Sequence, residues 1–204
     1  YGITQFRGIR NPHFGTTPLF ASGVHVQTSN AASNVFSTLK TGDFFNSADG
    51  TRTDVLRYDT PSFGGAKAAV SYSNNGSVGV EGTFGGKFGG FSVNAGVGYK
   101  NVAAASANNS NLGMGISVGH DSGLSVDANF SAVSGGSNNT DPTSWSVGAN
   151  YAASLTAMGT TTFRVAYVNS EDTTVKNDEG KAYIVGVEQG TSAGASFYLG
   201  YQHI

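Results

Sequence analysis

The sequence predicts an all-β chain, and in particular part of a transmembrane antiparallel β-barrel. Three observations indicate this: apolar and polar residues alternate with a period of two, charged residues make up only 12% of the 204 residues, and short and long connections alternate. Ordinary soluble domains contain roughly 25% charged residues, so much of this surface is expected not to face bulk water. No apolar run approaches the ~18 residues of a membrane helix, so only strands are left to cross a bilayer.

The strand prediction rests on the two-residue period. In LSVDANFSA (124–132) apolar residues alternate strictly with polar ones, which is the pattern of a strand with two unlike faces. This pattern recurs from Asp54 onward without a helical period between, so we expect ten antiparallel strands after residue 52 and one more over residues 1–10. After the first, near Val55, the apolar sets are Ala66–Tyr72, Val78–Phe84, Phe91–Tyr99, Leu112–Val118, Leu124–Ala132, Trp145–Tyr151, Phe163–Tyr167, Tyr183–Val187 and Ala195–Tyr201.

The connections support a barrel over a solenoid. Longer polar loops are expected at 101–111, 134–141 and 170–180, and shorter turns at 121–123 and 189–194. Short turns on one side and longer loops on the other are typical of outer-membrane barrels, whereas a solenoid has a fixed repeat length, which is absent here. Two connections depart from this rhythm, namely an Asn-Gly hairpin at 73–77 and a loop of intermediate length at 153–159.

The spacing of aromatic residues fits a bilayer. Phe91 and Tyr99 share a face and lie eight residues apart, roughly 26 Å along a strand. At a tilt of ~40° this corresponds to about 20 Å of membrane normal, close to the ~25 Å apolar band between aromatic girdles. The alternative is that these rings form the core of a soluble sandwich. A secreted or surface-displayed β-rich adhesin or matrix protein therefore remains the second hypothesis, which the 30 glycines also suit.

Composition argues against several classes of function. A net charge of −2 supplies no basic surface for nucleic acid, and the absence of cysteine removes disulfides, thiol catalysis and thiolate metal sites. The stretch 115–119 matches G-x-S-x-G, but it lies within a predicted strand with no helix after it, so we interpret it as chance. We expect no enzyme activity and no cofactor.

Metal binding is also not expected. The four histidines show no ligand spacing: His13, His25, His120 and His203. The acidic loops 138–142 and 170–180 offer carboxylates to Ca²⁺, but they lack the spacing of an EF-hand, and solvated loops are the simpler interpretation.

The segment RYDTPSFGG, residues 57–65, resembles the general porins of Gram-negative outer membranes. In that family an R-Y-(D/N)-(S/T)-P-x-F-G-G segment follows the long third loop. FRGIRNP (6–12) is similar to the strand end before that loop, TGDFFNSADGTR (41–52) to its return limb, and FYLGYQH near the end to a late strand.

The resemblance implies a barrel of about sixteen strands around a wet lumen, of which this chain would supply ten or eleven as a single partial domain over residues 1–204. It implies that residues 11–51 fold inward as a constriction loop. It also implies a homotrimer in the bacterial outer membrane, in contact with lipid and lipopolysaccharide, that passes small hydrophilic solutes and ions.

The parity of the strands predicts which charged residues face the lumen. Arg57 alternates with Leu56 and Tyr58, and a charge on the lipid face would cost ~2 to 4 kcal/mol at the midplane. The same argument assigns to the lumen Lys67, Glu81, Lys100, Asp127, Arg164 and Glu188.

The resemblance further implies a pore constriction. Arg57 and Arg10, together with Lys67, would form its basic wall, and Asp43 and Asp49 on the inward loop would oppose them. Such an arrangement makes a transverse field that orients dipolar solutes. The alternative is that these residues are ordinary charges at a wetted rim.

Overall fold

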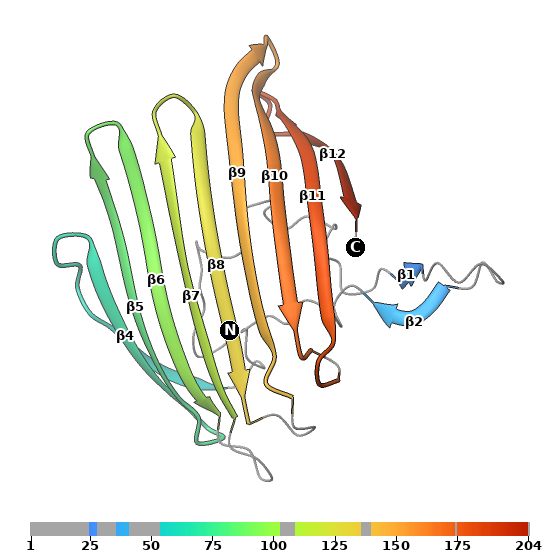
Figure 1. Ribbon diagram of the computed structural model, residues 1–204. Helices are drawn as coiled ribbons and strands as arrows, with labels where there is room; N and C mark the ends of the chain where they lie inside the picture. The colour runs from blue at the N-terminus through green and yellow to red at the C-terminus, as the bar shows by residue number, and fades with distance from the viewer. Residues whose placement is uncertain are drawn as a thin grey trace.

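The computed structural model describes residues 25–27, 36–40, 54–102, 109–135, 140–173 and 175–203. Every regular element in these ranges is a strand. Two of them, β1 (His25–Gln27) and β2 (Phe36–Lys40), pair only with each other. The others form one ten-stranded antiparallel sheet (Figure 1), made of β3 (Val55–Asp59), β4 (Ala66–Ser73), β5 (Val78–Phe88), β6 (Phe91–Val102), β7 (Asn109–His120), β8 (Leu124–Ser134), β9 (Thr143–Thr156), β10 (Gly159–Glu171), β11 (Glu179–Gly190) and β12 (Ser196–His203).

Each strand of this sheet pairs with its neighbours in chain order, and β3 and β12 form the two edges among the described residues. The prediction of ten antiparallel strands after residue 52 is therefore confirmed. The further strand expected over residues 1–10 lies outside the described residues, as does most of the expected constriction loop 11–51, apart from β1 and β2.

Several strands are longer than the sequence predicts. β6 ends at Val102 and β7 begins at Asn109, so both ends of the expected loop 101–111 are paired strand. Likewise β9 ends at Thr156 and β10 begins at Gly159, so the loop expected at 153–159 is a tight turn. Backbone pairing continues in both hairpins past the point where side chains stop alternating, because the ladder needs only N–H and C=O groups.

The two ends of the sheet differ as expected. In Figure 1 the turns 89–90, 121–123 and 157–158 lie along the upper edge, and the ends of β8 and β10, where the longer connections to β9 and β11 begin, lie along the lower edge. We refer to these edges as the short-turn end and the long-loop end. The tight Asn-Gly hairpin at 74–77 is an exception at the long-loop end.

A glycine turn ties two hairpins together at the short-turn end. Gly123 has a φ of 90°, and a Cβ atom on it would lie 2.0 Å from the carbonyl oxygen of Ala152. The Ala152 amide donates a hydrogen bond to the Gly123 carbonyl at 2.9 Å, so the β7–β8 turn rests directly against β9. Only glycine fits this left-handed backbone at such a close approach.

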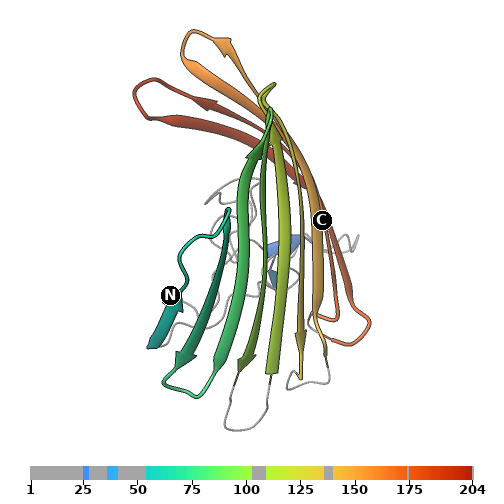
Figure 2. The same ribbon diagram turned by 90° about the vertical axis from the view of Figure 1, so that its left-hand side faces the viewer.

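The sheet is curved (Figure 2) and has two unlike faces. One, the apolar face, carries many exposed large hydrophobic side chains, up to 78% exposed at Leu56. The other, the polar face, carries residues of the opposite parity and is much less exposed, with Ser71, Lys100 and Asp127 all buried. The curvature of the sheet explains this difference in exposure, because side chains converge on its concave side and spread apart on its convex side.

The described residues include almost no conventional core. Only Val168, Ala182 and Ile184 are buried hydrophobic side chains, and they pack together with Ala166 on the polar face of β10 and β11. A single-layered wall whose apolar residues point outward needs no other core, provided that lipid covers its apolar face.

The apolar face shows that the strands are tilted. From Tyr72, direct cross-strand partners lead through Val78 to Asn101, and the next aromatic residue, Tyr99, lies two residues closer to the short-turn end. The same two-residue step recurs from Thr143 to Trp145, from Asn169 to Tyr167 and from His203 to Tyr201.

We call this set of residues the aromatic line; it consists of Tyr72, Tyr99, Trp145, Tyr167, Tyr183 and Tyr201. Over the eight steps from β4 to β12 it moves two residues towards the short-turn end at four places, which is one residue for each strand. At ~3.3 Å per residue and ~4.8 Å between strands, the climb corresponds to a tilt of about 35°, the value expected of a barrel wall. Its rings touch where the line crosses three strands, since the Trp145 and Tyr167 centroids lie 5.2 Å apart and those of Tyr167 and Tyr183 4.9 Å.

Candidate pore-lining face

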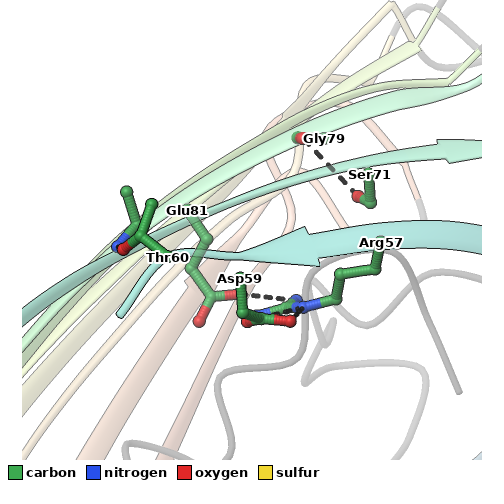
Figure 3. Close-up of polar contacts among 7 residues, drawn as sticks. Arg57, Asp59, Thr60, Ser71, Gly79 and Glu81 are labelled. Carbon is green, nitrogen blue, oxygen red and sulfur yellow. Dashed lines mark hydrogen bonds and ion pairs between the residues drawn. The ribbon is translucent and has the colours of Figure 1, made fainter. Parts of the chain in front are cut away.

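Arg57 stands at the centre of an ion-pair group on the polar face of β3, β4 and β5 (Figure 3). Its Nε and Nη2 donate to the carboxylate of Asp59, at 2.9 Å to Oδ2 and 2.7 Å to Oδ1. Its Nη1 donates to Oε2 of Glu81 at 3.1 Å. The Arg57 guanidinium is thus held between two carboxylates, one through a bidentate contact.

The register of the strands explains why Glu81 can reach Arg57. Asp59 pairs with Ala69, and Ala69 pairs with Glu81, so the acid lies one strand beyond β4. Ala69 has only a methyl group, which leaves the space above β4 open to the two long side chains. The Glu81 side chain is 9% exposed and that of Arg57 28%, so their ion pair is better shielded from water than the contact with Asp59, whose side chain is 58% exposed.

A second polar group lies on β8 to β11. Arg164 donates through Nη2 to Oε2 of Glu188 at 2.7 Å, and both side chains are largely shielded. Beside them, Asn150 donates to Ser125 at 3.4 Å and to Asp127 at 3.5 Å. Because Arg164 pairs directly with Asn150, and Asn150 with Ser125, these side chains form a continuous polar row across four strands.

The sequence-predicted site residues that the structure describes all have the parity of the polar face. Their environments differ: Arg57 and Arg164 are in ion pairs, Lys100 is 2% exposed, and Lys67 is exposed. The whole set is Arg57, Lys67, Glu81, Lys100, Asp127, Arg164 and Glu188. The constriction residues Arg10, Asp43 and Asp49 lie outside the described residues.

Sequence reasoning did not single out Asp59, and it placed Ser125 and Asn150 on the polar side of their strands without predicting their contacts. Asp59 lies two residues from Arg57 and therefore on the same face of the strand, so its place on the polar face could have been predicted. Asn150 and Ser125 share the parity of the polar face, but they carry no charge to mark them. Their contact with Asp127 depends on the register between β8 and β9, which the sequence does not contain.

The acidic loop 172–178 uses its carboxylates to bind its own backbone. Asp178 accepts hydrogen bonds from the amides of Thr173 at 2.7 Å and Val175 at 3.1 Å. Asp172 accepts one from the amide of Asn177. In the part of the chain that the structure describes, no group of three or more His, Asp or Glu residues is arranged to hold a metal ion.

The charges of the apolar face are confined to one end. Along β3 to β12 they are Glu171, Glu179 and Lys181, which lie on the long-loop side of Tyr167 and Tyr183. Between the aromatic line and the short-turn end, the described strands carry no charge on this face. No helix among the described residues is long and apolar enough to cross a membrane.

A tilted antiparallel sheet with one apolar and one charged face is typical of the wall of a membrane β-barrel protein. The chain matches the Gram-negative porin family over residues 13–204, and it belongs to that family. It is therefore a protein of the bacterial outer membrane, as the sequence resemblance implied. No curated protein matches it.

Two solved outer-membrane proteins share the fold. The chain is 16% identical to OccK10 (OpdN) of Pseudomonas aeruginosa, with a TM-score of 0.54 over 75% of this chain and 58% of that one. It is 17% identical to the outer-membrane expressed OmpT of Vibrio cholerae, with a TM-score of 0.50 over 72% of this chain and 53% of that one. The chain thus spans little more than half the length of either protein.

Proposed function

We propose that this chain forms part of the wall of a passive diffusion pore for small hydrophilic solutes and ions, with no catalytic step. The observation that carries the proposal is the segregation of charge between the two faces of one sheet. The polar face holds Arg57, Glu81, Asp127, Arg164 and Glu188, while the apolar face is uncharged between its aromatic line and the short-turn end.

Energetics support this orientation. A charged side chain on the lipid face costs ~2 to 4 kcal/mol at the midplane, whereas a water-filled interior lets the same side chain stay hydrated. With the apolar face towards lipid, every described charge of β3 to β9 faces the interior. A solute moving past this wall would exchange water for the carboxylates, guanidinium groups and amides that line it, and these groups would set its selectivity.

The family suggests further features of the intact protein, which we include in the proposal. Residues 11–51 would fold into the lumen, with Asp43 and Asp49 facing the basic side chains of Arg10, Arg57 and Lys67. Three copies would associate as a homotrimer, in contact with lipid and lipopolysaccharide, and no cofactor would be needed.

The test is conductance of the intact porin. Envelopes are washed in plain buffer and then extracted with detergent, and the purified protein is added to a planar bilayer. The proposal expects extraction only by detergent, followed by stepwise increases in conductance. Release into plain buffer would favour an adhesin or matrix protein, and a detergent-extracted barrel without conductance would be an anchor and not a pore.

A further inference from the structure

The register of the sheet brings six of the charged residues of the polar face close to one height in the wall. The aromatic line of the apolar face climbs one residue towards the short-turn end for each strand, so a line of constant height in the membrane must climb in the same way. Arg57 pairs with Ser71, and Ser71 with Gly79. Two steps along this line therefore lead to Glu81, which lies at the height of Arg57.

The same construction reaches the other polar group. The direct cross-strand partners of Glu81 lead through β6 and β7 to Ser131 of β8. Because these are three steps, the level on β8 lies three residues from Ser131 towards the short-turn end, which is one residue from Asp127. Asp127 pairs with Gly148, and Gly148 pairs with Ala166. Two steps at one residue each then reach Arg164. One more step ends within one residue of Glu188.

Two distant groups of the sequence thus form one charged belt across the wall. The belt consists of Arg57, Asp59, Glu81, Asp127, Arg164 and Glu188, all within two residues of one level. It holds two arginines and four carboxylates, and each arginine is already in an ion pair with a carboxylate of the belt. The excess charge of the belt is therefore negative.

The three lysines that the structure describes on the polar face lie further from this level, and Lys87 is six residues from it towards the short-turn end. Lys67 lies three residues from the level towards the short-turn end, and Lys100 three residues towards the long-loop end. Three residues are about 10 Å along a strand, which is about one Debye length at 0.1 M salt. Lys67 is nevertheless close enough for its charge to act on Asp59, and counting it with the belt still leaves three cations against four carboxylates.

We propose that the charged belt makes the pore select for cations, both inorganic cations and small cationic hydrophilic solutes. This inference rests on the proposed pore function and adds the charge of the preferred solute. Each arginine contributes little attraction for anions because a carboxylate at 2.7 to 3.1 Å already compensates its charge. The remaining carboxylate charge lies on the polar face, where it acts on a passing ion.

The experiment is the reversal potential of the intact porin in a planar bilayer between two KCl solutions of unequal concentration. The parent protein is expected to prefer K⁺ over Cl⁻. Asp127→Asn and Glu81→Gln, on β8 and β5, should each lower the permeability ratio by about sevenfold, because one charge at ~7 Å in water changes the permeability to K⁺ by nearly threefold and that to Cl⁻ by as much in the opposite direction. Glu179→Gln, which removes the same charge from the apolar face at the long-loop end, should leave the ratio unchanged.

The outcomes separate the two proposals. A parent protein without conductance would overturn the pore function itself. A conducting parent that prefers Cl⁻, or a ratio that neither belt variant changes, would overturn only the cation selectivity. If Asp127→Asn fails to reach the membrane, Glu81→Gln tests the same statement from a separate strand.

Discussion

Arg57 and Glu81 form an ion pair across an intervening strand, with Nη1 of the arginine 3.1 Å from Oε2 of the acid. The pair crosses β4 diagonally, because Arg57 lies opposite Ser71 and Glu81 lies opposite Ala69. Its geometry joins three strands on the polar face without any backbone contact between β3 and β5. It also determines how much of the Arg57 charge a solute would meet.

Reversing the charge at residue 57 should increase cation preference. Arg57→Glu changes the local charge by two units beside Asp59 and Glu81, so the K⁺/Cl⁻ permeability ratio is expected to rise about fiftyfold, and Arg57→Gln should give about sevenfold, since each charge acts on K⁺ and Cl⁻ in opposite directions. The reversal potential in a KCl gradient measures both. Equal ratios in the parent and both variants would place Arg57 outside the path of the ions.

Filling the space above β4 should break the bridge. In Ala69→Leu the larger side chain stands between Arg57 and Glu81, so we expect a smaller single-channel conductance and a loss of about 1 to 2 kcal/mol in unfolding free energy. Ala68→Leu adds the same carbons to the exposed apolar face and should change neither. Identical conductance in the two variants would show that residue 69 does not face the pore.

The orientation of the faces can be tested by placing a lysine on each. Val126→Lys puts a charge on the apolar face of β8, at a cost of ~2 to 4 kcal/mol in lipid. Ser125→Lys, one residue away, puts it on the polar face and should cost less than about 1 kcal/mol. Reversible unfolding in lipid vesicles gives both values, and a reversed order would mean that the polar face meets lipid.

Two turn glycines should respond differently to a methyl group. Gly123 and Gly194 both have positive φ, 90° and 82°, so alanine at either position costs roughly 1 to 2 kcal/mol of backbone strain. At Gly194 nothing lies within 4 Å of the added carbon, but at Gly123 it would meet the carbonyl oxygen of Ala152. Gly123→Ala should therefore destabilise the protein clearly more than Gly194→Ala, as measured by urea unfolding in vesicles; equal losses would contradict the packing of the β7–β8 turn on β9.

The strands could be predicted from the sequence because one wall of a barrel has a strong two-residue contrast between its faces. Leu124 to Ala132 shows it, and the structure places this whole segment in β8. The ends of strands were less predictable. Residues such as Asn101 and Asn109 lie beyond the aromatic line, where both faces meet water and the contrast disappears.

The candidate site was predictable only as a face. Parity assigned Arg57, Glu81 and Arg164 to the polar side, but it could not show that Glu81 compensates Arg57, since that contact depends on which residues of β3, β4 and β5 lie opposite one another. The resemblance implied a basic wall around Arg57. The structure adds the carboxylates of Asp59 and Glu81 to the same wall, where both are in ion pairs with Arg57.

The climb of one residue for each strand has a consequence for how such a wall can change its length. Removing one residue from the middle of β8 would turn every side chain beyond that point to the opposite face, so that Asp127 would enter lipid. Removing two would keep the faces but shift the carboxylate by about 7 Å along the strand, away from Glu81 and Arg164. Insertions and deletions in the connections between strands change neither the faces nor the height of the charged belt, so the connections are where the chain can change in length.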